Sequence, residues 1–344
     1  MSRTLAIGLL LFGGIAGASA QPLNARIGEA VPRDVRELYD KGLQYLAKSQ
    51  TENGDWRDGQ QGPGTTGMAL MVFLASGEDP NFGVYSNNVR RAVRSIISNQ
   101  NATTGYLGSS MYHHGFAMLG LAEAYGAVDD RSVWPSGKMP RTIGAALELA
   151  VRAAVTSQKK NSFGAWRYSP GSTDADTSVS GAVLVGLLAA RNAGIEVPDD
   201  SINRAISYYT SMTGGSGTVG YSGGIGGLDE SLARSSIAAL VYSLARRKDL
   251  SQFKATISYL ANNLEATGRG GAGGVEYQRY YQAQALFQGD VEAWKKWNTL
   301  LVRQLKATQQ ADGSIPGQHG TMIGTSLSLL ALALNYRFLP IYER

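Results

Sequence analysis

A repeat of about fifty residues constrains the fold more than any other feature of the sequence. In each copy a helical segment ends in a short, usually Gly-rich loop, and a second, more apolar helical segment follows. The clearest copy runs from Lys41 to Gln50 and continues through Gly54 to Trp56. A period of this length is typical of architectures in which each unit buries its apolar face against the next unit. The chain should therefore fold as an array of helical hairpins.

Every copy pairs an amphipathic segment, expected on the outside, with a segment that is apolar nearly all round and so expected to be buried. In the first copy the outer segment spans residues 34–50 and the inner segment spans 66–76. Apolar residues recur three and four positions apart in these segments, which predicts helices. The remaining outer segments are expected at 88–100, 142–158, 200–212, 251–264 and 291–310. The remaining inner segments are expected at 116–125, 178–192, 235–246, 280–287 and 324–336.

Six such hairpins can bury their apolar residues by closing into a ring, with the inner helices surrounded by the outer ones. The sequence thus predicts an all-α (α/α)6 toroid of six helical hairpins, in a single domain that spans residues 30–344. An open superhelix of helical pairs is the alternative. The count of six and the strongly apolar inner segments favour the closed ring. The apolar segment 338–342 is then expected to seal the first hairpin against the last.

The first twenty residues have the pattern of a secretory signal peptide. Arg3 precedes an apolar run over residues 5–15, and small residues from Ala18 to Ala20 provide a cleavage site. The apolar run is shorter than the roughly 20 residues that a membrane-spanning helix needs, which favours cleavage over a membrane anchor. We therefore expect an exported protein, periplasmic or extracellular, that starts at Gln21 and keeps no transmembrane segment after cleavage of residues 1–20.

Composition excludes several classes of function. The chain contains no Cys, so thiolate catalysis, disulfides and Cys-ligated zinc are ruled out. Its 32 basic and 27 acidic residues are interspersed, and the longest basic tract covers only residues 246–248. That pattern is typical of a solvated surface and not of a nucleic-acid groove. No nucleic-acid partner is expected.

The clearest copy places a basic, a small, an aromatic and an aliphatic residue before Gln and a Gly-x-Trp motif. These positions hold Lys41, Gly42, Tyr45, Leu46, Gln50, Gly54 and Trp56, and looser copies follow Gln100, Gln158 and Gln309. In these residues the chain resembles the repeats of the prenyltransferase and squalene-cyclase superfamily. It looks closest to an exported bacterial branch of unassigned function, through His114-Gly115, Asp176 to Gly181, Tyr280-Tyr281, Trp294 and the terminal segment 336–342. The resemblance implies a six-hairpin toroid with a central cavity.

The sequence departs from the superfamily at its catalytic motifs. Squalene-hopene-type cyclases resemble one another in an Asp-x-Asp-Asp-Thr motif whose middle Asp protonates the alkene. Aligned on Thr177, this chain has Ala175 in the place of that Asp. Protein prenyltransferase β subunits resemble one another in Asp, Cys and His zinc ligands, whereas this chain has no Cys and carries Gly324 where the His is expected.

Unusual residues collect in the loops that lead from an outer to an inner helix. In a ring these loops share one rim with the N-termini of the inner helices, which favour anions. We predict catalytic residues on this rim at Asp174, Asp176, Glu230 and His319. We predict ligand-binding residues at Tyr112, His113, His114, Trp166, Arg167, Tyr168, Tyr277, Tyr280 and Tyr281.

Several of these residues also have a structural interpretation. The acidic residues suit helix N-caps, Trp166 suits packing between hairpins, and Tyr280 and Tyr281 suit either the cavity lining or the core. Because His113 and His114 are adjacent, on a helix they point about 100° apart and are not expected to share a metal ion. No metal and no cofactor are predicted.

Three functions are open to such a rim. The one that we prefer is an exported toroid whose cavity binds an apolar or glycan-like small molecule. The second is a polysaccharide-active lyase or hydrolase, in which carboxylates with Tyr or His supply the acid and the base. The third is an isoprenoid cyclase or transferase that uses Asp174 or Asp176 as its acid, with aromatic faces stabilising a carbocation. The sequence does not decide whether the protein is an enzyme.

Overall fold

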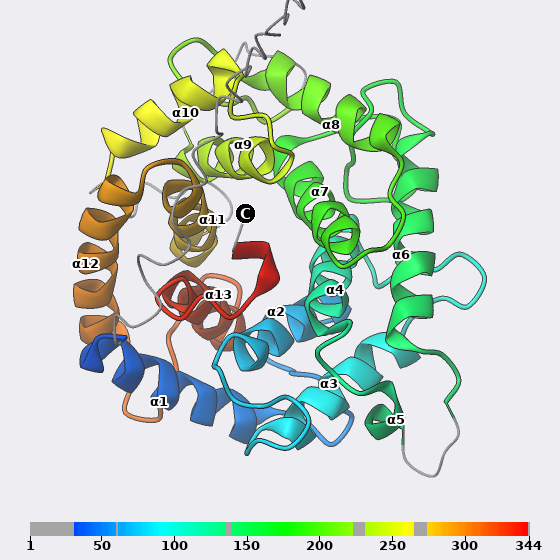
Figure 1. Ribbon diagram of the computed structural model, residues 1–344, viewed down its shortest axis with the longest axis vertical. Helices are drawn as coiled ribbons and strands as arrows, with labels where there is room; N and C mark the ends of the chain where they lie inside the picture. Colours follow the sequence, from blue (N-terminus) through cyan, green and yellow to red (C-terminus); the bar gives the residue numbers. More distant parts are fainter. Residues whose placement is uncertain (1–30, 60, 135–138, 223–230, 265–273, 343–344) are drawn as a thin grey trace, which may run out of the picture. The chain divides into compact units, whose positions relative to one another are not determined.

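Six buried helices form an inner ring and six further helices surround it, in the part of the chain that the structure describes (Figure 1). The computed structural model describes residues 31–59, 61–134, 139–222, 231–264 and 274–342. Only two isolated β-bridges and no strand occur among these residues. The predicted (α/α)6 toroid of six helical hairpins is therefore confirmed. The expected signal peptide, residues 1–20, lies outside the described residues.

The inner helices are buried on nearly all sides, as their apolar composition predicts. They are α2 (Pro63–Leu74), α4 (Met111–Ala124), α7 (Thr177–Asn192), α9 (Leu232–Leu244), α11 (Gly274–Gly289) and α13 (Thr321–Ala333). Each packs against the next around the ring, and α13 packs back against α2. The inner ring is therefore closed.

The outer helices bury one face each, in keeping with their amphipathic sequences. They are α1 (Arg33–Ser49), α3 (Ser86–Ser98), α6 (Ile143–Gln158), α8 (Asp199–Met212), α10 (Ser251–Ala261) and α12 (Val291–Thr308). A short helix, α5 (Asp130–Val133), follows the second hairpin, and a 3-10 turn, η3 (Pro340–Tyr342), ends the described chain. None of the described helices is long and apolar enough to cross a membrane.

Glutamine side chains tie successive outer helices together. The amide nitrogen of Gln50, which follows α1, donates to the carbonyl of Gly54 at 3.1 Å and to the carbonyl of Asn88 on α3 at 3.0 Å. Each Gln therefore joins the loop after its own helix to the next outer helix. The same pair of hydrogen bonds recurs at Gln100, Gln158 and Gln309.

Glycines allow adjacent inner helices to approach closely. A Cβ atom on Gly67 of α2 would lie 2.5 Å from the carbonyl oxygen of Phe116 on α4. A Cβ atom on Gly115 of α4 would lie 2.5 Å from the backbone of Ala182 on α7. Because real Cβ atoms do not come that close, α4 can pack backbone to backbone with both neighbours only with glycine at these positions.

The C-terminal segment extends beyond the junction of the first and last hairpins. Its first residue, Phe338, lies against Gly77, just after the first hairpin, as the prediction requires. Leu339 and Ile341 are buried, and η3 packs against α7. Figure 1 shows this segment in red within the ring of helices. The chain turns inward after α13 because Leu339 and Ile341 find an apolar environment there, and the first and last outer helices are joined by other contacts.

The inner helices begin earlier than their apolar runs predict. Helix α4 starts at Met111, because the side chain of Ser110 caps it by accepting from the backbone of His113 at 3.4 Å. Helix α11 starts at Gly274, six residues before the predicted segment 280–287. Residues expected in loops, such as His113 and Tyr277, therefore lie in the first turns of inner helices.

Candidate functional site

A cavity of about 770 Å³, here termed the rim cavity, opens at the N-terminal ends of the inner helices. All six inner helices contribute lining residues from their first turns, as do the loops before them. Five of the predicted site residues line it, and they come from four separate stretches of the chain: Tyr112, His113, Tyr168, Tyr277 and His319. The fold thus brings these residues together, on the rim where the sequence predicts a site.

The floor of the rim cavity is apolar. Met68 on α2, Phe116 on α4, and Ile323 and Leu327 on α13 form it, and each of them is buried. Met68, Phe116 and Leu327 lie in the second turns of their helices, one turn beyond the polar residues of the first turns, and Ile323 lies in the first turn of α13. An apolar group of a ligand would lose its contact with water on this floor, at a gain of about 25 cal/mol per Å² of buried apolar area.

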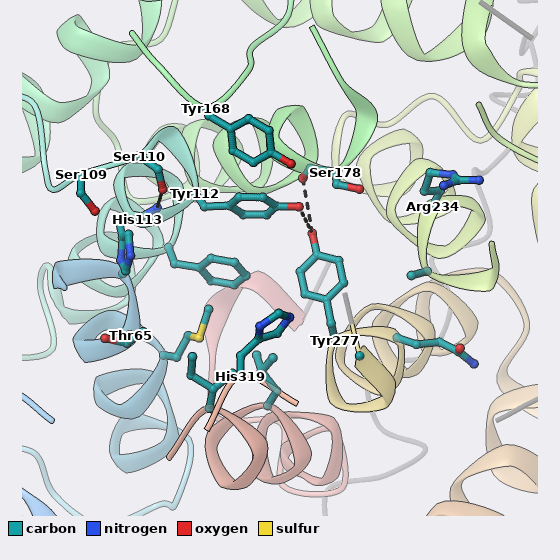
Figure 2. Close-up of a pocket in the computed structure, with 18 of the residues that line it drawn as sticks. Thr65, Ser109, Ser110, Tyr112, His113, Tyr168, Ser178, Arg234, Tyr277 and His319 are labelled. Carbon is teal, nitrogen blue, oxygen red and sulfur yellow. Dashed lines mark hydrogen bonds between the residues drawn. The ribbon is translucent and has the colours of Figure 1, made fainter. Parts of the chain in front are cut away.

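The mouth of the rim cavity carries hydroxyl groups. The Tyr168 and Tyr221 hydroxyls lie 2.8 Å apart, and Ser178 at the start of α7 faces the same space. Figure 2 shows the ring of Tyr112 between Tyr168 and the deeper part of the cavity. The ring centroids of Tyr112 and Tyr168 are 6.1 Å apart. Aromatic faces and hydroxyls in this arrangement suit a ligand that is partly apolar and partly polar.

A cationic side chain and the N-terminal ends of the inner helices face the rim cavity. Arg234 lies on α9, and its Nε donates to the carbonyl of Val219 at 2.9 Å. The Arg234 guanidinium also lies 6.0 Å from the centroid of the Tyr221 ring. No Asp or Glu is found among the described lining residues. The N-terminal ends of the inner helices add partial positive charge at the same level.

Two histidines line the rim cavity from different helices. His113 belongs to the first turn of α4, and His319 precedes α13. Both are half-buried, and burial lowers the pKa of His113, so that its imidazole is neutral at neutral pH. Figure 2 shows His113 at the left of the cavity and His319 at its lower edge. A neutral imidazole can donate one hydrogen bond and accept another.

His114 does not line the cavity, although we predicted it among the ligand-binding residues. It is 0% exposed; its Nδ1 accepts from the backbone of Leu107 at 3.1 Å, and its Nε2 lies 2.9 Å from the carbonyl of Ala150. Burial lowers its pKa to about 4, so the ring is neutral. Because adjacent residues on a helix point about 100° apart, His113 faces the ring interior and His114 faces α6. His114 thus holds two segments together.

The predicted residues Trp166, Tyr280 and Tyr281 are also buried outside the cavity lining. Trp166 donates from Nε1 to the carbonyl of Ala154 at 2.9 Å, which ties a loop to α6. The Tyr280 ring lies 5.9 Å from Phe116, and Tyr281 packs against Tyr277 and Tyr280 at 4.8 Å. Tyr280 and Tyr281 thus pack within the inner ring, whereas Trp166 packs against the outer helix α6.

Asp176 caps helix α7 and lies outside the cavity lining. Its Oδ1 accepts from the backbone of Val179 at 2.8 Å, and its side chain is fully buried. The Arg167 guanidinium joins Asp174 at 2.9 Å and lies 3.8 Å from Oδ2 of Asp176. Burial raises the pKa of Asp176 to about 6, against the opposing influence of the cap and of Arg167. Asp174 is exposed, and Glu230 lies outside the described residues.

Several lining residues were not predicted from the sequence. They include Gln61, Thr65, Ser178, Tyr221 and Arg234. Arg234 carried a usable signal, since a cation in the first turn of an apolar inner helix needs a polar neighbour. Tyr221 had no such signal in the sequence, because its position depends on how its loop docks on α7. The backbone nitrogen of Thr177 donates to the carbonyl of Tyr221 at 2.9 Å. No group of three or more metal-ligating side chains occurs among the described residues.

The closed double ring of helices and the cavity at one end of it define an α/α toroid. Residues 36–330 match the family described as a domain of unknown function, DUF6288, and the chain belongs to that family. No curated protein matches the chain by sequence.

Solved structures with the same fold include two enzymes of different chemistry. An inactive variant of the α-1,6-mannanase GH76A of Salegentibacter sp. HEL1_6, in complex with α-1,6-mannotriose, is 10% identical with a TM-score of 0.63, over 88% of this chain and 99% of that one. A variant of the type II terpene cyclase MstE from Scytonema, in complex with geranylgeranyl dihydroxybenzoate, is 13% identical with a TM-score of 0.62, over 89% and 98%. A protein from Actinoplanes is 12% identical with a TM-score of 0.56, over 88% and 99%. At these identities the likeness establishes the fold alone.

Proposed function

We propose that the protein is exported and that its rim cavity binds an amphipathic small molecule. The apolar part of the ligand would lie on the floor formed by Met68, Phe116 and Leu327. Its polar part would lie among the hydroxyls, imidazoles and guanidinium of the mouth. The observation that carries this proposal is the division of the lining into an apolar floor and a polar mouth without a described Asp or Glu.

The size and the electrostatics of the rim cavity support binding. Its volume of about 770 Å³ lies in the usual range of small-molecule sites. The inner-helix N-termini favour a ligand whose polar part is electron-rich or anionic. Export is proposed from the charged, apolar and small-residue order of residues 1–20.

The toroid relatives support a cavity that holds either a glycan or an isoprenoid. The mannanase structure is a complex with α-1,6-mannotriose, and the cyclase structure is a complex with geranylgeranyl dihydroxybenzoate. The proposed ligand has an apolar part, as geranylgeranyl dihydroxybenzoate does. Binding thus has support from fold and lining together.

The two enzymatic alternatives have less support. Glycoside hydrolysis uses a pair of carboxylates that flank the scissile bond, and the described lining contains none. An isoprenoid cyclase needs an acid that reaches the substrate. Asp176 instead faces the backbone of Val179, and Asp174 is occupied by Arg167 at 2.9 Å. A protein that only binds its ligand does not need Asp174 or Asp176 to reach the cavity.

Mass spectrometry of molecules extracted from the purified mature protein tests this function. We expect an amphipathic molecule in the extract of the wild-type protein and little in that of Ala233→Trp, because Ala233 lines the cavity and an indole there would fill it. Ala145→Trp on the exposed face of α6 is the matched control and should retain the molecule. An empty wild-type protein, or equal content in both variants, would contradict the proposal.

A further inference from the structure

Two tyrosines from opposite sides of the inner ring meet inside the rim cavity. Tyr112 belongs to α4, which packs against α2 and α7, whereas Tyr277 belongs to α11, which packs against α9 and α13. Their hydroxyl oxygens are nevertheless only 3.3 Å apart. Figure 2 shows the two hydroxyls pointing toward each other, with His113 to the left, His319 below, and Ser178 and Arg234 to the right. The hydroxyl pair of Tyr112 and Tyr277 therefore occupies the middle of the cavity.

The hydrogen bonds of this hydroxyl pair are long. Tyr277 donates toward the Tyr112 oxygen at 3.3 Å and toward the carbonyl of Ser178 at 3.4 Å. An O–H···O hydrogen bond normally spans 2.5–3.0 Å, so both of these are longer than usual. By contrast, the Tyr168 and Tyr221 hydroxyls at the mouth are 2.8 Å apart. The proton of Tyr277 therefore has two distant acceptors, and the Tyr277 hydroxyl also interacts with that of Tyr281.

The surroundings of the hydroxyl pair make weak hydrogen bonding costly. Tyr277 is only 8% exposed, and the apolar ring of Phe116 is a lining residue nearby on the helix that bears Tyr112. Burial raises the pKa of both phenols above the ordinary value, so both keep their protons at neutral pH. A buried hydroxyl with a poor partner loses free energy that a good acceptor would restore. The site can therefore accept an oxygen atom that brings no proton of its own.

We propose that the hydroxyl pair of Tyr112 and Tyr277 is the polar anchor of the ligand, and that it selects a molecule with an acceptor oxygen, such as a carboxylate or a phosphate ester. Both hydroxyls donate to that oxygen at ordinary length, and the apolar remainder of the ligand extends over Phe116 and Met68. This assignment rests on the ligand-binding function proposed above. It adds the class of head group and the two residues that recognise it.

Binding of matched twelve-carbon amphiphiles to the mature protein tests the anchor. The probes are dodecanoate, dodecyl phosphate, dodecan-1-ol and dodecyltrimethylammonium, and isothermal titration calorimetry gives each dissociation constant. We expect dodecanoate or dodecyl phosphate to bind at least tenfold more tightly than dodecyltrimethylammonium, which has no acceptor oxygen; tenfold is about the value of one good hydrogen bond. The stronger of the two anions identifies whether carboxylate or phosphate is preferred.

Conservative variants assign the effect to the hydroxyl pair. Tyr277→Phe and Tyr112→Phe should each weaken binding of the preferred anion about tenfold and leave dodecyltrimethylammonium unchanged. Tyr45→Phe is the matched control, because Tyr45 lies on the outer helix α1, is half-buried and does not line the cavity, and it should bind as the wild type does. Thermal unfolding confirms that each variant is folded, and either member of the pair alone suffices for the test.

The outcomes separate the anchor from the proposed function. If the wild type binds none of the four probes, both the ligand-binding function and the anchor are contradicted. If it binds the ammonium probe as tightly as the anions, or if neither Tyr→Phe variant weakens anion binding, the cavity binds amphiphiles but the hydroxyl pair is not its anchor.

Discussion

The side-chain amide of Gln309 donates to the carbonyl of Leu38 at 2.8 Å, across 271 positions of the sequence. The same amide nitrogen donates to the carbonyl of Gly313 at 3.0 Å. This is the arrangement that joins α1 to α3 through Gln50, now used to join α12 to α1. One local motif therefore both spaces the outer helices and closes the ring.

Gln309→Ala should destabilise the fold. The substitution removes two hydrogen bonds and leaves the carbonyls of Leu38 and Gly313 without that donor. We expect the free energy of unfolding to fall by about 1–3 kcal/mol, as measured by urea denaturation. Gln310→Ala, at the exposed neighbouring position, is the control and should change stability by less than about 0.5 kcal/mol. Equal effects of the two substitutions would show that Gln309 does not close the ring.

Gly313→Ala should destabilise the same junction for a different reason. Gly313 has φ 91°, and a Cβ atom there would lie 2.1 Å from the carbonyl oxygen of Lys41 on α1. The left-handed backbone alone costs about 1 kcal/mol for alanine, and the collision with backbone adds to that cost. The unfolding temperature of Gly313→Ala should therefore be well below that of the wild type.

Gly194→Ala separates the two contributions to this cost. Gly194 has φ 94°, close to that of Gly313, but nothing lies within 4 Å of its Cβ position. We expect it to lose only the conformational part, about 1 kcal/mol, and so to unfold at a higher temperature than Gly313→Ala. If both variants unfold at the same temperature, the close approach to Lys41 has no energetic effect.

The ring could be predicted from the sequence because its determinants repeat. Gln50 and Gln309 end their outer segments at equivalent positions, and each is followed four residues later by a glycine that packs on the next outer helix. The position of Gln relative to the loop glycine is local in sequence, so it can be recognised without knowing the three-dimensional contacts. The predicted rim location of the site followed from the same order of helices and loops.

The side chains that face the rim cavity were harder to predict, because an error of one residue on a helix rotates a side chain by about 100°. Ser110 caps α4 before its apolar run begins, and this start decides that His113 faces the cavity and His114 does not. Tyr221 reaches the mouth through hydrogen bonds between its loop and Thr177. Neither the cap nor the loop docking can be recognised from a hydrophobic pattern.

His114→Phe should destabilise the protein far more than His113→Phe. The phenyl ring fits an apolar site, but it leaves the backbone nitrogen of Leu107 and the carbonyl of Ala150 without their partner, at about 2–4 kcal/mol in total. His113 is half-buried in the cavity lining, so its replacement should cost less than about 1 kcal/mol. Urea denaturation at pH 7 measures both. A larger loss for His113→Phe would reverse the assignment of the two imidazoles.

His114 should also make the wild-type protein sensitive to acid. Its pKa in the folded state is about 4, below the ordinary value of 6.5, so the unfolded chain binds the proton more readily. The stabilisation from the neutral ring is complete above pH 6.5 and is lost as the pH falls toward 4. As the pH is lowered from 7 to 4, the unfolding temperature should therefore fall more steeply for the wild type than for His114→Phe. Parallel profiles would show that His114 is protonated equally well in the folded protein.

Asp176 should make the protein less stable as the pH rises, whereas His114 makes it less stable as the pH falls. Its folded-state pKa is about 6, above the ordinary value of 3.8, so its contribution to stability is complete below pH 4 and is lost as the pH rises through 6. Asn can keep the cap on the backbone of Val179 and carries no charge. We expect the stability of Asp176→Asn relative to the wild type to increase by about 2–3 kcal/mol between pH 4 and pH 8.

Asp290→Asn provides the control, because Asp290 caps α12 through the backbone of Ala293 at a half-buried position. Both variants keep an N-cap side chain, so the comparison isolates the effect of the buried carboxylate of Asp176. Urea denaturation at pH 4, 6 and 8 gives the three values for each protein. If the free energy of unfolding of the wild type instead rises relative to that of Asp176→Asn as the pH increases, the charge of Arg167 outweighs burial. The pKa of Asp176 is then lowered in the folded state.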